Sequence, residues 1–254
     1  TCTQVRKPMK TCTLWCVVML VSLIGISTSV DGQDSPELLG EIALIGEDNN
    51  VYLLSLEDAN LTPITNDATL RRVYRLPTWS LDGDLAYFAE TYANNTNAPH
   101  ELDVYMRSNQ TAEVKQIYTQ MDEAILTAAW SPRHCELDEA CNILAFGVSL
   151  IESGQFALRL AGETLIAGSV SNDSGWPSPI YHTWSPDGTR LVVHYSESAL
   201  ATFDIVAALE ERLPYTPGHF RTPAWSPVDD RLLFGARNRE DAAQTDLFIL
   251  AYSE

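Results

Sequence analysis

The chain has 254 residues, of which 45% are hydrophobic and 20% are charged, so its composition is that of a globular protein with ample material for a core. Its 34 acidic and 16 basic side chains give a formal net charge of −18. This charge argues against a protein that binds nucleic acid or an anionic lipid surface, because both ligands require a basic protein surface.

An apolar stretch near the N-terminus has the layout of an export signal. Lys10 precedes the uncharged run Leu14–Ile26, and small polar residues follow at 27–29. The run is shorter than the roughly 20 apolar residues of a bilayer-spanning helix. An uncleaved membrane anchor is the alternative interpretation. We expect the chain to associate with a membrane only through this segment.

The domain boundaries follow from this interpretation. We expect residues 1–32 to be the signal or anchor and residues 33–254 to be the exported body, periplasmic or extracellular. The first methionine is Met9, so we expect residues 1–8 to lie upstream of the true start.

The cysteines of the exported body are Cys135 and Cys141. A pair of cysteines in an oxidising compartment predicts a disulfide, with two free thiols as the alternative. A metal site with the neighbouring His134 is a weaker interpretation, because two thiolates and one imidazole fall short of the four ligands of a structural zinc site.

One short phrase recurs along the chain: a tryptophan followed by serine, at spacings of 51, 54 and 41 residues. Such periods are typical of propeller blades. In three of the four copies proline directly follows the serine, and in two copies an Asp-Gly pair comes next; these residues favour a tight turn. The copies are Trp79-Ser80, Trp130-Ser131, Trp184-Ser185 and Trp225-Ser226, which we interpret as structural repeat residues.

Short apolar segments bounded by Gly, Asn, Asp and Pro surround each copy, which is a strand pattern. We therefore predict an all-β protein, a β-propeller of four-stranded antiparallel blades. If the Trp-Ser strand is the innermost one, the first unit supplies strands two to four and the last supplies strands one to three. Three complete blades lie between them, which makes about five in all.

These repeats resemble the TolB-like, or WD40-like, propeller family, whose repeat ends on P-x-W-S-P-D-G. The third copy, Trp184-Ser185-Pro186-Asp187-Gly188, matches most fully, and the resemblance covers about Glu41 to Tyr252. The second copy departs from the pattern, because the longer segment Arg133–Cys141 replaces the Asp-Gly turn. A disulfide between its two cysteines would link the two ends of that longer loop. Similar propellers often have six blades, which implies an incomplete ring with residues missing at the C-terminus. The alternative is a five-bladed ring with one imperfect seam.

The sequence carries no G-x-S-x-G, H-E-x-x-H, G-x-G-x-x-G or P-loop motif, and its five histidines are scattered. We therefore expect no catalytic residue, no metal and no cofactor. The leading hypothesis is a non-enzymatic binding or scaffold module for a protein, peptide or glycan. We expect its contacts in the links Thr91–Glu101, Arg133–Cys141, Ser169–Tyr181 and Arg237–Thr245.

The alternative function comes from a second resemblance. Similar propellers precede the hydrolase domain of prolyl-oligopeptidase-like serine peptidases and gate their substrates. The catalytic domain of such a peptidase is not part of this sequence, so the chain would act as the gating domain alone.

The proposed disulfide gives a first prediction. Mass spectrometry of peptides from exported, non-reduced protein is expected to show Cys135 linked to Cys141, because the compartment is oxidising and the pair is isolated. Recovery of both cysteines as free thiols from the same material would show that the prediction is wrong.

Overall fold

A computed structural model describes residues 40–93, 98–132, 142–162, 168–170, 179–195, 199–205, 207, 209–218, 223–238, 240, 241 and 243–251. The chain divides into two units, Thr1–Leu38 and Leu39–Glu254, and every described residue lies in the second. The regular elements in these ranges are all β-strands. No helical segment with the length and apolarity needed to cross a membrane occurs in the ranges described. Cys135, Cys141 and the expected signal lie outside them.

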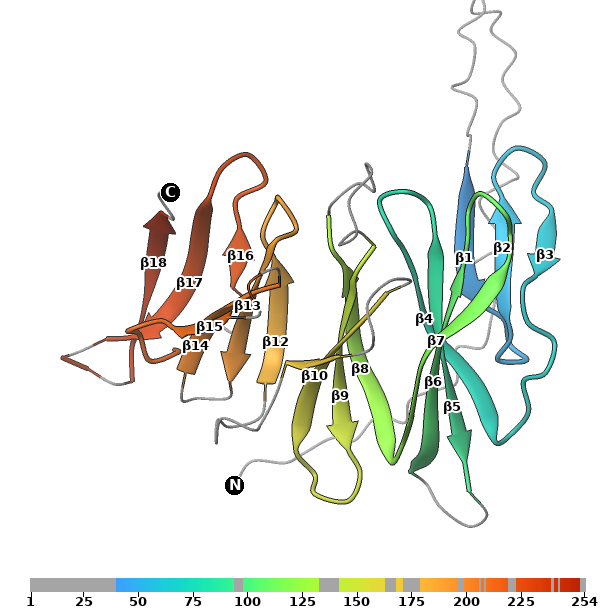
Figure 1. The fold of residues 1–254 in the computed structure, drawn as a ribbon, viewed down its shortest axis with the longest axis horizontal. Helices are drawn as coiled ribbons and strands as arrows, with labels where there is room; N and C mark the ends of the chain where they lie inside the picture. The colour runs from blue at the N-terminus through green and yellow to red at the C-terminus, as the bar shows by residue number, and fades with distance from the viewer. Residues whose placement is uncertain are drawn as a thin grey trace, which may run out of the picture. The chain divides into compact units, whose positions relative to one another are not determined.

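The described strands form five antiparallel sheets that follow one another along the chain (Figure 1). Sheet 1 contains β1 (Glu41–Ile45), β2 (Val51–Ser55) and β3 (Leu61–Pro63). Sheet 2 contains β4 (Arg72–Trp79), β5 (Leu85–Tyr92), β6 (Pro99–Arg107) and β7 (Val114–Met121). Sheet 3 contains β8 (Glu123–Trp130), β9 (Leu144–Leu150), β10 (Phe156–Ala161) and β11 (Gly168–Val170). Sheet 4 contains β12 (Pro179–Trp184), β13 (Arg190–Tyr195), β14 (Ala199–Asp204) and β15 (Leu209–Arg212), and sheet 5 contains β16 (Ala224–Trp225), β17 (Arg231–Arg237) and β18 (Thr245–Ala251).

This topology confirms the predicted all-β blades. Each sheet is a meander whose neighbours in space are neighbours in sequence, with three strands in the first and last sheets and four in the others. The first strand of each of sheets 2 to 5 ends on the tryptophan of the repeat. The fourth strand of sheet 3 is the short Gly168–Val170, where Val170 pairs with Leu158.

The Trp-Ser turns show why the repeat carries these residues. Gly83 and Gly188 adopt φ values of 83° and 68°, in the region that side chains disfavour. The Ser80 hydroxyl accepts a hydrogen bond from the Asp84 amide at 2.9 Å, and the Ser185 hydroxyl accepts one from the Arg190 amide at 3.0 Å. The serine therefore closes the turn that glycine makes possible.

The inner sheets bury both faces, since successive side chains of a strand point to opposite sides. On β5, Leu85 and Tyr87 belong to the apolar cluster shared with sheet 1, whereas Ala86 and Phe88 belong to the cluster shared with sheet 3. Two further clusters join sheet 3 to sheet 4 and sheet 4 to sheet 5. Among the described residues, no cluster joins sheet 1 to sheet 5.

The repeated tryptophan makes the same contact at two successive interfaces. Trp130 donates its indole N–H to the carbonyl of Thr78 at 3.1 Å, and Trp184 donates to the carbonyl of Ala129 at 3.0 Å. In each case the acceptor is the residue before the tryptophan of the preceding sheet. Both rings are buried, with exposed fractions of 8% and 7%. The indole therefore fills apolar space and satisfies its one polar group in a single placement.

Replacing Trp184 with Ala is expected to lower the free energy of unfolding by about 3–5 kcal/mol, because it leaves a cavity between sheets 3 and 4. Trp184→Phe keeps much of the apolar contact but removes the N–H, so we expect a smaller loss. Urea unfolding of both variants measures the difference, and an unchanged midpoint in the alanine variant would contradict the role of the indole.

Candidate binding site

The meander places three of the four links singled out in the sequence at one end of the blades. The links β5–β6, β11–β12 and β17–β18 all leave or enter at the end opposite the Trp-Ser turns, because strand direction alternates along each sheet. The link Arg133–Cys141, between β8 and β9, belongs to the Trp-Ser end and lies outside the described residues. The topology thus separates this link from the other three.

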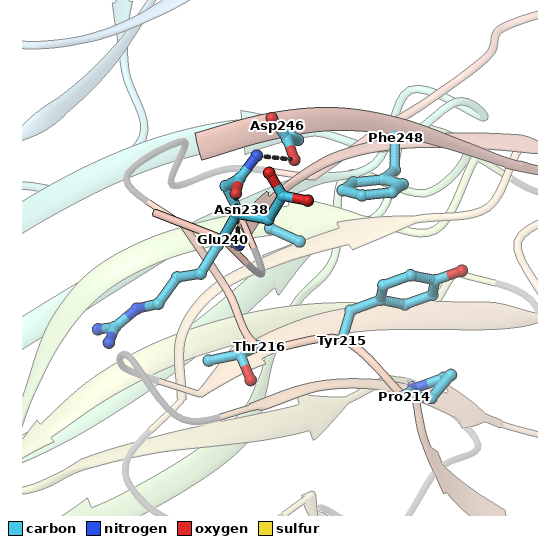
Figure 2. Close-up of a pocket in the computed structure, with 9 residues that line it drawn as sticks. Pro214, Tyr215, Thr216, Asn238, Glu240, Asp246 and Phe248 are labelled. Atoms are coloured by element: carbon cyan, nitrogen blue, oxygen red, sulfur yellow. Dashed lines mark hydrogen bonds between the residues drawn. The ribbon is translucent and has the colours of Figure 1, made fainter. Parts of the chain in front are cut away.

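A pocket of about 660 Å³ opens at the end that carries those three links (Figure 2). It lies between the segment that joins sheets 4 and 5 and the ends of β17 and β18. Its lining comprises Pro214, Tyr215, Thr216, Ala236, Arg237, Asn238, Glu240, Asp246 and Phe248.

Two aromatic rings line one part of the pocket and pack against a third, buried ring. The ring centroids of Tyr215 and Phe248 lie 5.4 Å apart, and both rings contact Phe234, at 4.9 Å and 5.7 Å. Phe234 is 1% exposed, so it anchors the other two, which remain partly accessible. Figure 2 shows the rings of Tyr215 and Phe248 as neighbours, one from each of the two segments that line the pocket.

Hydrogen bonds within the β17–β18 link hold the polar part of the pocket. The Asn238 side chain donates to Asp246 at 2.9 Å and accepts from the amides of Glu240 and Asp241 at 2.7 Å and 2.9 Å. Figure 2 shows the Glu240 carboxylate on the same side as Asp246 and Phe248. Two carboxylates therefore stand beside the aromatic rings.

The opposite wall is tied to the sheet by backbone contacts. The Arg237 amide donates to the carbonyl of Thr216 at 2.9 Å, and the Gly218 amide donates to the carbonyl of Gly235 at 3.0 Å. Gly218 is required here, because a Cβ at this position would lie 2.4 Å from the Thr245 side chain. The pocket is thus built from two segments whose separation is fixed.

The chemistry of this lining suits a ligand with a positive group on an apolar stem. Ring faces attract cations through their quadrupole, and the two carboxylates outnumber the one guanidinium of Arg237 in the lining. Sequence reasoning named the link Arg237–Thr245 but missed Tyr215 and Phe248, because neither carries a motif and each looks like an ordinary strand residue.

Three buried carboxylates form a second set of polar contacts, and two of them, Glu90 and Glu123, join sheets 2 and 3. Glu90 accepts from Arg75 at 2.6 Å and from the Ile125 amide of sheet 3 at 3.1 Å. Glu123 pairs with Arg159 at 2.5 Å and accepts from Tyr118 of sheet 2 at 2.7 Å.

Asp103 is the third buried carboxylate. It pairs with Arg72 at 3.2 Å and accepts a hydrogen bond from the side-chain amide of Gln116 at 2.8 Å. Every one of these carboxylates is paired with an arginine, as burial of charge requires, so we assign the set a structural role.

The remaining residues singled out in the sequence do not converge. Ser131 donates to the carbonyl of Gly188 at 3.2 Å, which adds to the contact between sheets 3 and 4. His100 lies 3.6 Å from Asp122, away from His182 of β12. His134 and His219 lie outside the described residues. Among the residues described, no three His, Cys, Asp or Glu side chains are grouped to hold a metal ion.

No protein-family model matches the sequence, and no curated protein matches it. Among solved structures, an oligogalacturonate lyase in complex with manganese matches with a TM-score of 0.50 and 15% identity, covering 81% of this chain and 54% of that one. The fold is that of a β-propeller.

Other propellers match less closely. An oligogalacturonate lyase from Vibrio parahaemolyticus has a TM-score of 0.48 and 13% identity, covering 79% of this chain and 54% of that one. A protein assigned to TolB from Agrobacterium tumefaciens has a TM-score of 0.45 and 16% identity, covering 76% and 62%. This chain spans about half the length of the two lyases, and at these identities the likeness shows the fold alone.

The environment of His182 gives a pH-dependence prediction. Its imidazole donates to the carbonyl of Ala145 in sheet 3, and burial lowers its pKa to about 4. In the unfolded chain the pKa of a histidine is near 6.5. Below that pH the unfolded state therefore binds a proton that the native state does not bind. Stability is therefore complete above about pH 6.5 and falls as the pH drops toward 4, by up to about 3 kcal/mol.

Urea unfolding between neutral and mildly acidic pH measures this loss. His182→Gln is expected to flatten the profile, whereas His100→Gln, at a half-exposed site, serves as the matched control. If both variants keep the wild-type profile, the acid sensitivity belongs to other groups.

Proposed function

We propose that the chain is an exported, non-enzymatic β-propeller that binds a basic segment of a protein or peptide. The observation that carries the proposal is the pocket that sets the rings of Tyr215 and Phe248 beside the carboxylates of Glu240 and Asp246. A lysine or arginine side chain matches it, with the aliphatic stem against the rings and the charged head at the carboxylates. Export is supported by the N-terminal pattern of the sequence.

The charge of the whole chain supports the same class of partner. A net charge of −18 attracts basic partners over a distance of about a Debye length, and the local carboxylates then fix the position of one cationic group. Glu240 is exposed, so its replacement changes charge without disturbing the core.

A fluorescently labelled arginine-rich peptide is the probe, and fluorescence anisotropy is the measurement. Glu240→Gln is expected to weaken binding about two- to fivefold, because an exposed carboxylate contributes up to about 1 kcal/mol to an ion pair. Glu211→Gln on β15 removes the same charge from another exposed position and is the control. Equal weakening by both variants would show a general charge effect and contradict a site at the pocket.

The fold does not decide by itself between a binding protein and an enzyme, since a lyase shares it. The same preparation is therefore incubated with oligogalacturonate, and unsaturated products are followed by ultraviolet absorbance. We expect no turnover, because two carboxylates in the pocket repel a polyanionic chain. Turnover by the purified chain would overturn the non-enzymatic proposal and leave the peptide-binding result to be judged separately.

A further inference from the structure

Sheet 2 ends on an outer strand that is longer than its counterparts. The outer strands of sheets 1, 3 and 4 have three, three and four residues, whereas β7 has eight. Proteins usually keep an edge strand short, charge it or place proline on it, because its unpaired N–H and C=O groups can pair with another chain. β3 contains Pro63, and three of the four residues of β15 are charged. β7 contains no proline, and its one charged residue is Lys115.

The backbone of β7 has hydrogen-bonding groups that point away from the sheet. Within the described residues, β7 pairs with β6 alone. At its two ends, the Glu113 carbonyl and the Asp122 amide hydrogen-bond to the side of β6, each at 2.9 Å. Because these directions alternate along an antiparallel pair, the neighbouring residues Val114 and Met121 point their N–H and C=O groups outward.

β7 is held firmly, so its edge is a preformed template. Ile117 and Tyr118 pack against the apolar cluster shared by sheets 2 and 3, and Tyr118 donates to the buried Glu123 at 2.7 Å. Near the ends of the strand, Val114 and Met121 are each 43% exposed and offer apolar surface to the side chains of a partner. A partner strand would therefore bind with little rearrangement of β7, which lowers the entropic cost of binding.

Two features of β7 restrict the partner to a short strand. The register between β6 and β7 shifts at Ile117, which forms a bulge, and a bulge increases the local twist. Lys115 adds a charge to the same edge. Both features oppose pairing with a long flat strand. The edge is therefore selective, and a short segment that follows its twist is the better match.

The charges around β7 indicate the chemistry of the partner. Residues 116–121 carry no charge, whereas Glu113 directly precedes the strand and Asp122 directly follows it, in a chain of net charge −18. An uncharged segment with a basic residue at each end would place opposite charges together. A second copy of this chain is a poorer match, because full antiparallel overlap of two β7 strands sets Glu113 of each copy opposite Asp122 of the other.

We propose that the outer edge of β7 is a site of strand addition, which takes a short extended segment of a partner protein as a fifth strand of sheet 2. The segment has an uncharged centre rich in β-branched and aromatic residues, and a lysine or arginine at each end. Backbone hydrogen bonds provide most of its affinity, and contacts with Val114 and Met121 add selectivity. The site shares no residue with the pocket of sheet 5, so either can bind without the other.

The probe is the fluorescently labelled peptide Lys-Thr-Val-Thr-Tyr-Val-Thr-Lys with blocked ends, and fluorescence anisotropy measures its binding to the full chain. Met121→Pro is expected to weaken binding about tenfold, because proline removes an outward N–H and places its ring at the edge. Met121→Ala keeps the N–H and is the control, with a loss of at most about twofold. Absence of binding by the wild type, or equal weakening by both variants, would overturn the proposal. Proline is tolerated on an edge strand where its nitrogen faces solvent, and thermal unfolding checks that the variant is folded.

Amide hydrogen exchange, followed by NMR, locates the peptide on the wild-type chain without any substitution. The peptide is expected to slow exchange at Val114 and Met121, because their N–H groups become hydrogen-bonded to it. The Asp122 amide is already bonded within the sheet and is expected to change little. Slowed exchange confined to the pocket of Tyr215 and Phe248 would show binding there instead, and the proposal of strand addition would be wrong.

A second peptide tests the placement of the charges. It has the same composition, but both lysines lie at its centre, so its net charge is unchanged. We expect it to bind about fivefold more weakly, because its lysines no longer lie beside Glu113 and Asp122. Equal binding of the two peptides would overturn the assignment of basic ends.

Analytical ultracentrifugation of the chain alone decides about a second copy. We expect its sedimentation to be the same with and without Met121→Pro. A concentration-dependent dimer that Met121→Pro abolishes would show that a second copy occupies the edge, and the proposal of a separate partner would be wrong.

Discussion

The structure depends on the contact between each repeated tryptophan and the sheet before it. A four-stranded sheet cannot shield both of its faces, so each blade gains a core only from its neighbours. The indole of Trp184 covers apolar residues of sheet 3 and donates its N–H to a backbone carbonyl there. In the bonds from Trp130 and Trp184, the acceptor is the residue before the previous tryptophan, so each bond fixes the offset between two blades as well as their contact.

Buried ion pairs reinforce the same interfaces. Glu90 and Glu123 each bond to a partner across the boundary between sheets 2 and 3. Removing one partner of such a pair would leave an uncompensated buried charge, which costs far more than a lost surface pair. Burial and the hydrogen bond from Tyr118 to Glu123 also raise the pKa of the Tyr118 hydroxyl, so this hydroxyl stays protonated across the ordinary pH range. These groups lie between blades and stabilise the sheets from which the links extend.

The arrangement of the sheets explains where the pocket lies. The pocket of sheet 5 combines residues from the segment before β16 with residues from the β17–β18 link. These segments meet because the meander returns both to the same end of the blade, where backbone bonds such as that from Arg237 to Thr216 hold them. The exposed face of the same sheet uses other residues, those that alternate with the buried ones on β17 and β18. One sheet thus presents a pocket lined by aromatic rings and carboxylates at its end and an apolar surface on its side.

The sequence by itself determined the class of fold and the number of strands in each unit. The Trp-Ser phrase marks one strand end, Asp-Gly marks the turn, and the period-2 pattern marks the following strand, so each signal is local and can be read without coordinates. The buried pairs such as Arg159–Glu123 and the meeting of Tyr215 with Phe248 were decided only by the tertiary structure. These contacts join residues that are distant in sequence or ordinary in type, and their meaning depends on which strand face they occupy and which sheet packs against it.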